Sequence, residues 1–528
     1  MSGTNDKKDI FGSKVDRRTA REQQANLAKK KMRNTAILVI LAVVLLFAGA
    51  RFINSNYIRR TLTAVTIGDM NFSATEYEYF FTAAHFEFRT QMIQLTGGMT
   101  AGLLPAEWVP LRSQIRDTET GETWADFISR IAIDNMSRLV SLYSAARANG
   151  YVLRDESREA MNEYIDLYRE DAQMHGMSFN NYLRRVFGRS MNERVFLNVK
   201  EFVYTANSFS EFMHESFNYS AEEIEDFYNR NSYSFDNFSY RAFFVRAEDV
   251  GFPAEFETPE LHEEAVEEAM EEARQIAQQF VDGITTQEDF IEAAFENDPE
   301  IFPDADAGTW RMAQGEQIAG AYRTWIWDAA RSYGDVTTFE TTNGVFVLFF
   351  VDRDVNDYYM VEMRQILILP EDVMEFLHQN ADGSLNEESF DAAVAQAEIA
   401  ASMRANTVYD LFVEAGATEE ALIELMDEHS DDWTEGGLYV DITKIHGRNK
   451  LIPEIEDWLF APGRQIGDFE LIRSEAFGYH LVFLSGFGER VRDVIADTRM
   501  REIDHGEWLE TLQPPPATMR WAHNLVQV

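Results

Sequence analysis

The feature that most constrains the fold is an internal repeat in the second half of the chain. A tryptophan, an arginine and a Gly-Asp pair recur with identical spacing, first as Trp325, Arg331 and Gly334-Asp335 and then as Trp458, Arg464 and Gly467-Asp468. A strand-like segment precedes each set, at 241–245 and at 364–368. Repeated elements at matching offsets indicate a duplicated structural unit. We therefore expect two copies of one α/β module, at 239–354 and 359–488.

A second constraint is an uncharged stretch near the amino terminus, Thr35–Ala50, whose apolar character continues through Phe52 and Ile53. As a helix this span is roughly 28 Å long, close to the hydrocarbon thickness of a bilayer. Basic residues precede it and an acidic chain follows. The positive-inside rule therefore predicts a transmembrane helix at 34–53, a cytoplasmic basic tail at 1–33 and an extracytoplasmic body. A signal peptide cleaved near Ala48-Gly49-Ala50 is the alternative.

Composition excludes several classes of function. The chain has 47 basic and 90 acidic residues, a formal charge of −43, and because residues 1–33 carry +6 the remainder carries −49. Such an acidic body disfavours nucleic-acid binding, which needs Lys and Arg for the phosphates. The chain has no Cys, so disulfides, thiolate zinc sites and a cysteine nucleophile are excluded. It also lacks HExxH, GxSxG, GxxxxGK[ST] and GxGxxG motifs, and we expect neither metal nor cofactor.

The region 54–236 has the helical periodicity and aromatic content of an all-α domain. Apolar spacing predicts a helix over Thr123–Gly150, and Ser220 with Glu223 reads as a capping box at the start of another helix. The many Phe, Tyr and Met residues either form a core or leave a partly open apolar surface for unfolded chains. The last segment, 489–528, is predicted to be a helix and a tail, with the helix ended by Pro514–Pro516.

Four segments of the second copy follow one another as an opening strand, a Gly-Gly turn, a proline-containing helix start and a closing strand with a histidine. They are Arg364-Gln-Ile-Leu367, Gly436-Gly437-Leu438, Leu451-Ile-Pro453 and Phe477-Gly-Tyr-His480. This series resembles the parvulin family of peptidyl-prolyl isomerases and covers essentially the whole second copy. The first copy matches this pattern less well, because Ala242 and Phe346 stand where the family has its two histidines. We expect the first copy to be a degenerate, catalytically silent domain.

The helical region also carries a resemblance. Val65–Gly68 followed by Asn71–Glu76 is similar to the strand-then-helix opening of SurA- and PpiD-type periplasmic folding factors. The implied fold class is α+β multidomain: a transmembrane helix, an all-α SurA-like chaperone domain and two tandem parvulin-like domains. The implied location is the bacterial inner membrane, single-pass, with the bulk of the chain in the periplasm. The implied partners are unfolded or newly exported polypeptides, with the secretion machinery as a further candidate.

Isomerising an X-Pro bond requires an apolar slot for the proline ring and a polar cluster that favours the twisted amide. The resemblance assigns the slot and the cluster to two sets of residues. The slot is formed by Leu451, Ile455 and Phe477, and the cluster by Gln365, Asp432, Ser474 and His480. Gln365 replaces a family histidine and Ile455 a family aromatic, so we expect weak activity. For His480 the alternative is a structural strand histidine whose hydrogen bonds are satisfied by a neighbour.

The leading functional hypothesis is a membrane-anchored extracytoplasmic folding factor that binds unfolded polypeptides and has weak isomerase activity in the second module. The alternative is a membrane-anchored scaffold or chaperone with inactive parvulin-like domains, docking a folded partner through its acidic domains. The two differ in their expected response to salt, because docking steered by charge weakens with ionic strength and apolar binding persists.

Overall fold

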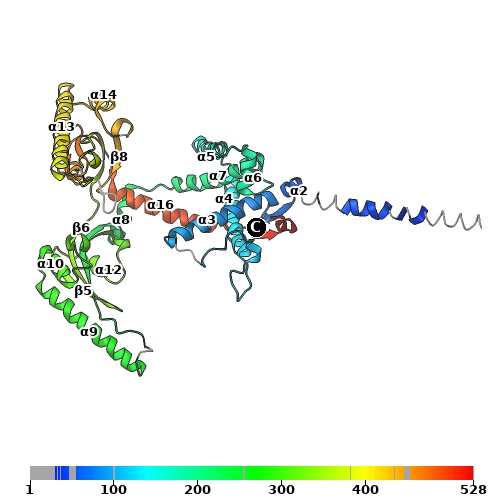
Figure 1. Cartoon of the computed structure of the whole chain (residues 1–528), viewed down its shortest axis with the longest axis horizontal. Helices are drawn as coiled ribbons and strands as arrows, with labels where there is room; N and C mark the ends of the chain where they lie inside the picture. Colours follow the sequence, from blue (N-terminus) through cyan, green and yellow to red (C-terminus); the bar gives the residue numbers. More distant parts are fainter. Residues whose placement is uncertain are drawn as a thin grey trace, which may run out of the picture. The chain divides into compact units, whose positions relative to one another are not determined.

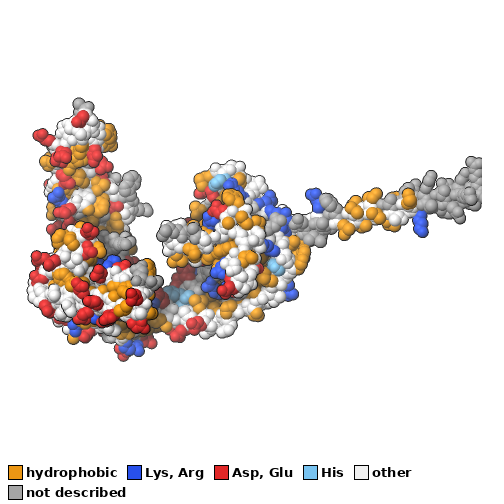
Figure 2. All heavy atoms as spheres, turned by 60° about the horizontal axis from the view of Figure 1, so that its bottom comes forward, with side chains coloured by type: hydrophobic (Ala, Val, Ile, Leu, Met, Phe, Trp, Pro, Cys, Tyr) orange, Lys and Arg blue, Asp and Glu red, His pale blue; other side chains and the backbone are white. Residues whose placement is uncertain are grey.

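A computed structural model of the chain describes residues 30–32, 34–35, 37–46, 51, 55–98, 102–253, 256–380, 382–432, 434–444 and 452–526. The chain divides into two compact units, of which the first comprises residues 1–217 and 503–528 and the second residues 218–502. In Figure 1 the first unit is mainly helical, blue to cyan with a red carboxyl-terminal part, and the second contains sheets, in green and in yellow to orange. In Figure 2 acidic side chains are widespread on the visible face of the second unit.

Helices build most of the first unit. They are α2 (Asn56–Thr61), α3 (Ala74–Leu95), α4 (Trp124–Ala148), α5 (Asp155–Met174), α6 (Phe179–Phe187) and α7 (Glu193–Ser216), with the 3₁₀ helices η1 (Leu111–Ser113) and η6 (Trp521–Leu525). The helix predicted over 123–150 is confirmed as α4, which starts with a capping box formed by Thr123 and Asp126 and has Asn149 as its C-cap. Most of the aromatic side chains are core, among them Phe80, Phe202 and Phe209, whereas Phe86 is 72% exposed.

The first unit is not all-α as predicted. It contains a three-stranded antiparallel sheet in the order β11–β1–β2, formed by β1 (Thr63–Ile67), β2 (Met70–Ser73) and β11 (Ala517–Met519). The outer strand β11 comes from the end of the chain, where Ile67 of β1 pairs with Ala517 and Val65 with Met519. The carboxyl-terminal segment is therefore part of the first unit's fold and its core, which includes Ala522 and Val526.

The second unit contains two sheets of the same design. The first module has β3 (Asn237–Arg246), β4 (Trp310–Gln314), β5 (Val336–Thr341) and β6 (Gly344–Asp354), in the order β4–β3–β6–β5. The second has β7 (Tyr359–Ile368), β8 (Leu438–Ile442), β9 (Phe469–Ser474) and β10 (Gly478–Arg490), in the order β8–β7–β10–β9. Numbered along each module, both sheets run 2–1–4–3 and all their pairs are antiparallel. The repeat read from the sequence thus corresponds to a repeated topology.

Helices cover both faces of each sheet. The first module adds α9 (Pro259–Gly283), α10 (Gln287–Asn297), α11 (Ala305–Thr309), η3 (Gly315–Gln317) and α12 (Arg323–Ile326). The second adds η4 (Glu375–Leu377), α13 (Glu387–Glu414), α14 (Glu419–His429), η5 (Glu435–Gly437) and α15 (Pro453–Leu459). In the second module, Phe412 of α13 packs on one face with Phe483 of β10, and Trp458 of α15 packs on the other with Val482.

Two further helices belong wholly or partly to the second unit. Tyr228 and Phe235 of α8 (Ala221–Phe235) form a small core with Ala496 of α16 (Val491–Thr511). The capping box predicted at Ser220 is present, but α8 belongs to the second unit, so the compact helical unit ends at Phe217 rather than at the predicted 236. The predicted helix before Pro514 is confirmed as α16, whose last residues, from Ile503, belong to the first unit.

Among the described residues, no helix combines the length and the apolar character needed to cross a bilayer. The predicted span at 34–53 includes residues 36, 47–50, 52 and 53, which lie outside the described residues. Most of the predicted cytoplasmic tail, 1–29 and 33, also lies outside them. The transmembrane helix therefore stays a prediction.

Candidate functional site

The candidate site lies on the α15 face of the second module's sheet. Side chains alternate between the faces of a strand, so Gln365 of β7 lies on the same face as Val361 and Met363. By the same alternation His480 of β10 faces the same way as Val482 and Leu484, which belong to the α15-side core. Three adjacent strands carry the predicted polar residues, with β10 pairing with β7 on one side and with β9 on the other. The sheet therefore presents Gln365, His480 and Ser474 side by side.

The loop after α14 supplies the fourth predicted residue. Asp431 donates its backbone N–H to the Leu367 carbonyl at 2.7 Å and accepts from the Leu369 N–H at 2.8 Å through its carboxylate. Ser430 accepts the Leu367 N–H at 3.2 Å. These bonds hold the loop along the edge of β7. Asp432, the next residue, is thereby placed against Gln365.

The four polar side chains predicted from the sequence form one continuous hydrogen-bonded row. The distances are 2.8 Å from Gln365 Nε2 to Asp432 Oδ2, 3.0 Å from Gln365 Oε1 to His480 Nδ1, and 3.0 Å from His480 Nε2 to Ser474 Oγ. Gln365, His480 and Ser474 are at most 7% exposed. We call this set, Asp432–Gln365–His480–Ser474, the polar row.

The chemistry of the groups determines which one donates and which one accepts in each hydrogen bond of the polar row. A carboxylate only accepts, so the Gln365 amide must turn its NH₂ toward Asp432 and its oxygen toward His480. His480 then donates from Nδ1 and accepts at Nε2 from the Ser474 hydroxyl, which itself accepts the Phe477 N–H at 3.1 Å. The row assigns His480 as a neutral imidazole with its proton on Nδ1.

Two further residues, Tyr439 and Thr434, lie at the Asp432 end of the polar row, and the sequence analysis did not identify either of them. Tyr439 of β8 donates its hydroxyl to Asp432 at 2.7 Å and lies 3.0 Å from the Thr434 hydroxyl. Burial alone would raise the pKa of Asp432, but the hydrogen bonds from Tyr439, the Thr434 backbone and Gln365 outweigh it, and the pKa is lowered. Asp432 is therefore a carboxylate at neutral pH. The signal that could have identified Tyr439 is its position directly after the Gly436-Gly437-Leu438 turn.

We expect His480 to titrate below the ordinary histidine range. Burial lowers its pKa, and the negative charges of Glu454 and Asp432 oppose that shift only in part. The unfolded chain then takes up a proton at about pH 6.5 while the folded one does not. The second module should therefore be most stable above pH 6.5 and lose stability as the pH falls through the folded-state pKa. Imidazole proton resonances followed against pH, with His480→Gln to assign the signal, measure this. Titration of His480 at or above pH 6.5 would contradict it.

The apolar residues assigned to the proline slot are not brought together in the same way. Leu451 lies outside the described residues. Ile455 is 1% exposed and packs in the core with Trp458 and Leu459, because α15 turns this face toward the sheet. Phe477 is 52% exposed and borders a separate groove of about 390 Å³ beside Phe390 and Pro370. The predicted open wall at Ile455 is thus not present in this structure.

The equivalent face of the first module is apolar. Ala242 belongs to a hydrophobic cluster there, and Phe346 packs against it. The Phe346 ring lies 4.7 Å from that of Phe244 and 5.6 Å from that of Tyr322, measured between centroids. In the described part of this module, aromatic packing therefore occupies the position that the polar row occupies in the second.

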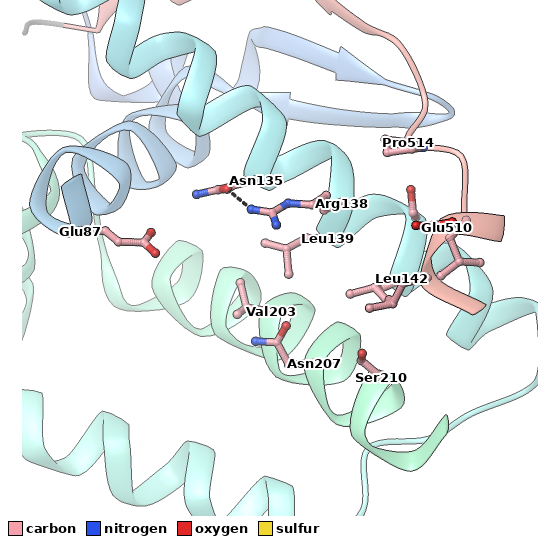
Figure 3. A pocket seen from close by; sticks show the side chains of 13 residues that line it. Glu87, Asn135, Arg138, Leu139, Leu142, Val203, Asn207, Ser210, Glu510 and Pro514 are labelled. Atoms are coloured by element: carbon pink, nitrogen blue, oxygen red, sulfur yellow. Dashed lines mark hydrogen bonds between the residues drawn. The ribbon is translucent and has the colours of Figure 1, made fainter. Parts of the chain in front are cut away.

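A second feature lies in the first unit, a cleft of about 760 Å³ bounded by α4, α7 and the end of α16 (Figure 3). Leu139, Leu142 and Val203 line one wall, and Leu509, Leu512 and Pro514 line the other. Glu87, Arg138 and Glu510 add charges. The cleft thus combines apolar walls with charged groups of both signs.

Comparisons with known proteins give no family assignment. No protein-family model matches the chain, and no curated protein matches it. Among solved structures, a SurA-like chaperone of Campylobacter jejuni is 18% identical, with 41% of this chain and 77% of that chain covered and a TM-score of 0.17. The peptidyl-prolyl isomerase PrsA of Bacillus cereus is 11% identical over 62% and 96%, with a TM-score of 0.26. PrsA of Bacillus subtilis is 10% identical over 60% and 93%, with a TM-score of 0.15.

These neighbours are SurA-like chaperones and PrsA isomerases. Their TM-scores, between 0.15 and 0.26, are too low to carry a functional argument.

Proposed function

We propose that the chain is a folding factor of the bacterial inner membrane that binds unfolded or newly exported polypeptides in the periplasm. In this proposal the apolar segment 34–53 anchors it, the first unit holds the polypeptide, and the second module is a weak peptidyl-prolyl isomerase. The observation that carries the proposal is the polar row, which the second module has and the first module replaces by aromatic packing.

The polar row suits the chemistry of amide rotation. A planar amide owes its rotational barrier of about 18–20 kcal/mol to resonance that places negative charge on the carbonyl oxygen. A carboxylate such as Asp432 facing that oxygen disfavours the planar form more than the twisted one. The hydroxyl of Tyr439 lies beside that carboxylate. Because Asp432 is fixed by three hydrogen bonds, from Gln365, Tyr439 and the Thr434 N–H, it needs no reorganisation when the amide twists.

Weak activity is expected from two features. The position of a family histidine is held by Gln365, whose amide cannot exchange a proton with His480. Ile455 is buried in the core and offers no open face to a proline ring. The site therefore has a preorganised polar half and lacks part of its apolar half.

Removing one preorganised group in such a site typically costs a hundredfold or more, but this site is expected to be weak and so has less activity to lose. We expect Asp432→Asn together with His480→Ala to lower isomerase activity roughly ten- to a hundredfold. The measurement is exchange NMR on an Xaa-Pro peptide with the full chain, which needs no coupling protease. Phe346→Leu, at the position equivalent to His480 in the first module, is the matched control and should leave the rate unchanged. Undiminished activity in the double variant, or a loss in the control, would contradict the assignment.

The holding function is supported by the cleft of the first unit. Its walls expose Leu139, Leu142 and Val203 in part, and apolar clefts with a few polar groups are the common form of a binding site. A polypeptide segment with apolar side chains would bury them there. Charged groups such as Arg138 and Glu510 would contact its backbone or polar side chains.

The alternative function is a scaffold that docks one folded partner through the second unit. The strong negative charge of the second unit favours this alternative, because residues 218–502 include 62 acidic and only 19 basic residues. Docking of that kind should weaken strongly between low and physiological salt, because exposed charges are screened beyond about 8–10 Å. Binding of an unfolded client to the cleft should change little over the same range.

A further inference from the structure

The charge of the chain is divided unevenly between its two units. The second unit, 218–502, carries 62 acidic and 19 basic residues, whereas residues 55–217 and 503–528 carry 24 acidic and 17 basic ones. In Figure 2 blue side chains gather at the side of the first unit that carries α2 in Figure 1. The first unit is therefore the part of the protein on which a positive surface can form.

Arginines of α2, of α6 and of the turn after α6 lie together in the first unit. Arg184 and Arg185 are exposed on α6, while Leu183 and Phe187 of the same helix are buried in the core. Arg60 of α2 donates from Nε to the Ser190 carbonyl at 2.7 Å, which ties α2 to the turn that follows α6. We define Arg60, Arg184, Arg185 and Arg189 as the α2–α6 basic patch.

The arginines of the patch are close enough to influence one another. Burial lowers the pKa of Arg60, and the charge of Arg184 lowers it further. Arg59, on α2 and 1% exposed, has its pKa lowered by burial and then by Arg189. Arg60 is thus near Arg184, which Arg185 follows directly on α6, and Arg189 is near Arg59 of the same α2 helix. Their charges add at that surface.

Two acidic side chains close to this turn in the fold or in the sequence are already engaged. Glu78 is buried at 5% exposure, lies 3.7 Å from Arg59 and accepts a hydrogen bond from Ser190. Glu193 pairs with Arg169 at 2.9 Å. Neither carboxylate is therefore available to neutralise Arg184 and Arg185, which stay exposed on α6.

The patch lies next to the apolar segment in the sequence. Thr35–Ala50 is followed by Arg51, and α2 begins at Asn56. Tyr57 of α2 is 65% exposed, and tyrosine is enriched where protein meets lipid headgroups. We propose that the α2–α6 basic patch binds the phosphate groups of anionic phospholipids at the membrane surface.

Physical chemistry favours that partner. Guanidinium groups bind phosphate with paired hydrogen bonds, and each basic side chain near an anionic membrane adds about 1 kcal/mol. Acidic residues of the second unit that lie beyond about 8–10 Å of the lipid are screened at physiological salt, so their charge does not cancel the attraction. The inference goes beyond the proposed function and holds whether or not the second module is an isomerase.

The test uses residues 55–528, because a full chain would attach to any vesicle through its apolar segment. The described hydrophobic clusters all use residues from 64 onward, so this chain keeps its cores. Co-sedimentation compares vesicles of phosphatidylcholine alone with vesicles that contain phosphatidylglycerol. We expect binding only to the anionic vesicles, weakened roughly ten- to thirtyfold by R184Q/R185Q.

The matched control is R89Q/R130Q, which removes two exposed arginines from the same unit but outside the patch. It should bind as the unmodified chain does, and thermal melting checks that both variants fold. Equal binding to the two vesicle types, or unchanged binding of R184Q/R185Q, would overturn the proposal. Binding to neither vesicle would also overturn it and would leave the patch to an acidic protein partner.

Discussion

Removing residues 514–528 should destabilise the first unit, although these residues follow its last α-helix in the sequence. The deletion takes away β11, which pairs with Val65 and Ile67 of β1, and the buried Ala522 and Val526. Lost strand hydrogen bonds at about 1 kcal/mol each and lost apolar burial together come to about 5 kcal/mol or more, which approaches the stability of a whole domain. We expect the melting transition of the first unit to fall by roughly 10–20 °C.

Calorimetry of the full and shortened chains measures the shift, and hydrogen exchange at the Val65 and Ile67 amides locates it. A chain that ends at Val526 is the control, since it keeps β11 and η6, and it should melt like the full chain. An unchanged transition after the larger deletion would show that the carboxyl-terminal strand does not stabilise the unit.

Gly437→Ala should disrupt the second module strongly, although the substitution adds only one methyl group. Gly437 has φ +52°, and a Cβ there would lie 2.1 Å from the Met426 Cε and 2.6 Å from the Gln365 carbonyl oxygen. The methionine end can move, but the β7 backbone cannot without shifting Gln365 and the polar row. A strained left-handed alanine costs about 1–2 kcal/mol, and the overlap adds several more, so we expect about 3–5 kcal/mol of destabilisation and loss of isomerase activity.

Gly383→Ala separates the two causes. Gly383 also has a left-handed φ, +85°, but a Cβ there would meet nothing within 4 Å. It should cost about 1–2 kcal/mol and leave the isomerase rate unchanged. If the two variants had equal effects on stability and rate, close packing of Gly437 against β7 would play no part.

The sequence predicted the features that depend on local pattern. The matched spacing of Trp325 and Trp458 led to two sheets with one strand order, and the apolar spacing over Thr123–Gly150 led to helix α4. It could not predict β11, because Ala517–Met519 is three residues long, has no strand pattern and pairs with a strand over 400 residues away. It also misplaced α8, whose partner Ala496 lies more than 250 residues further along the chain.

Part of the candidate site could also be predicted from local sequence, and part of it could not. The four members of the polar row could be anticipated, because their order along the chain resembles a known motif and strand pairing then brings them together. The position of Tyr439 directly after the Gly-Gly-Leu turn was the one available signal for it. Its hydrogen bond to Asp432 could not be predicted, because that bond depends on the exact position of an edge strand against the Asp432 loop. The burial of Ile455 could not be predicted from the sequence either, because the packing of Trp458 and Leu459 determines which face of α15 lies against the sheet.

The central claim is that the polar row isomerises prolines in polypeptides that the first unit holds. The most direct measurement is the slow, proline-limited refolding of an unfolded client protein with the full chain present. We predict acceleration by the unmodified chain and its loss in D432N/H480A. We also predict a strong reduction in L142E/V203E, which places charges in the cleft, but not in V152E, which places one at an apolar residue elsewhere in the unit that is 73% exposed. Equal acceleration by D432N/H480A and the unmodified chain would contradict the claim.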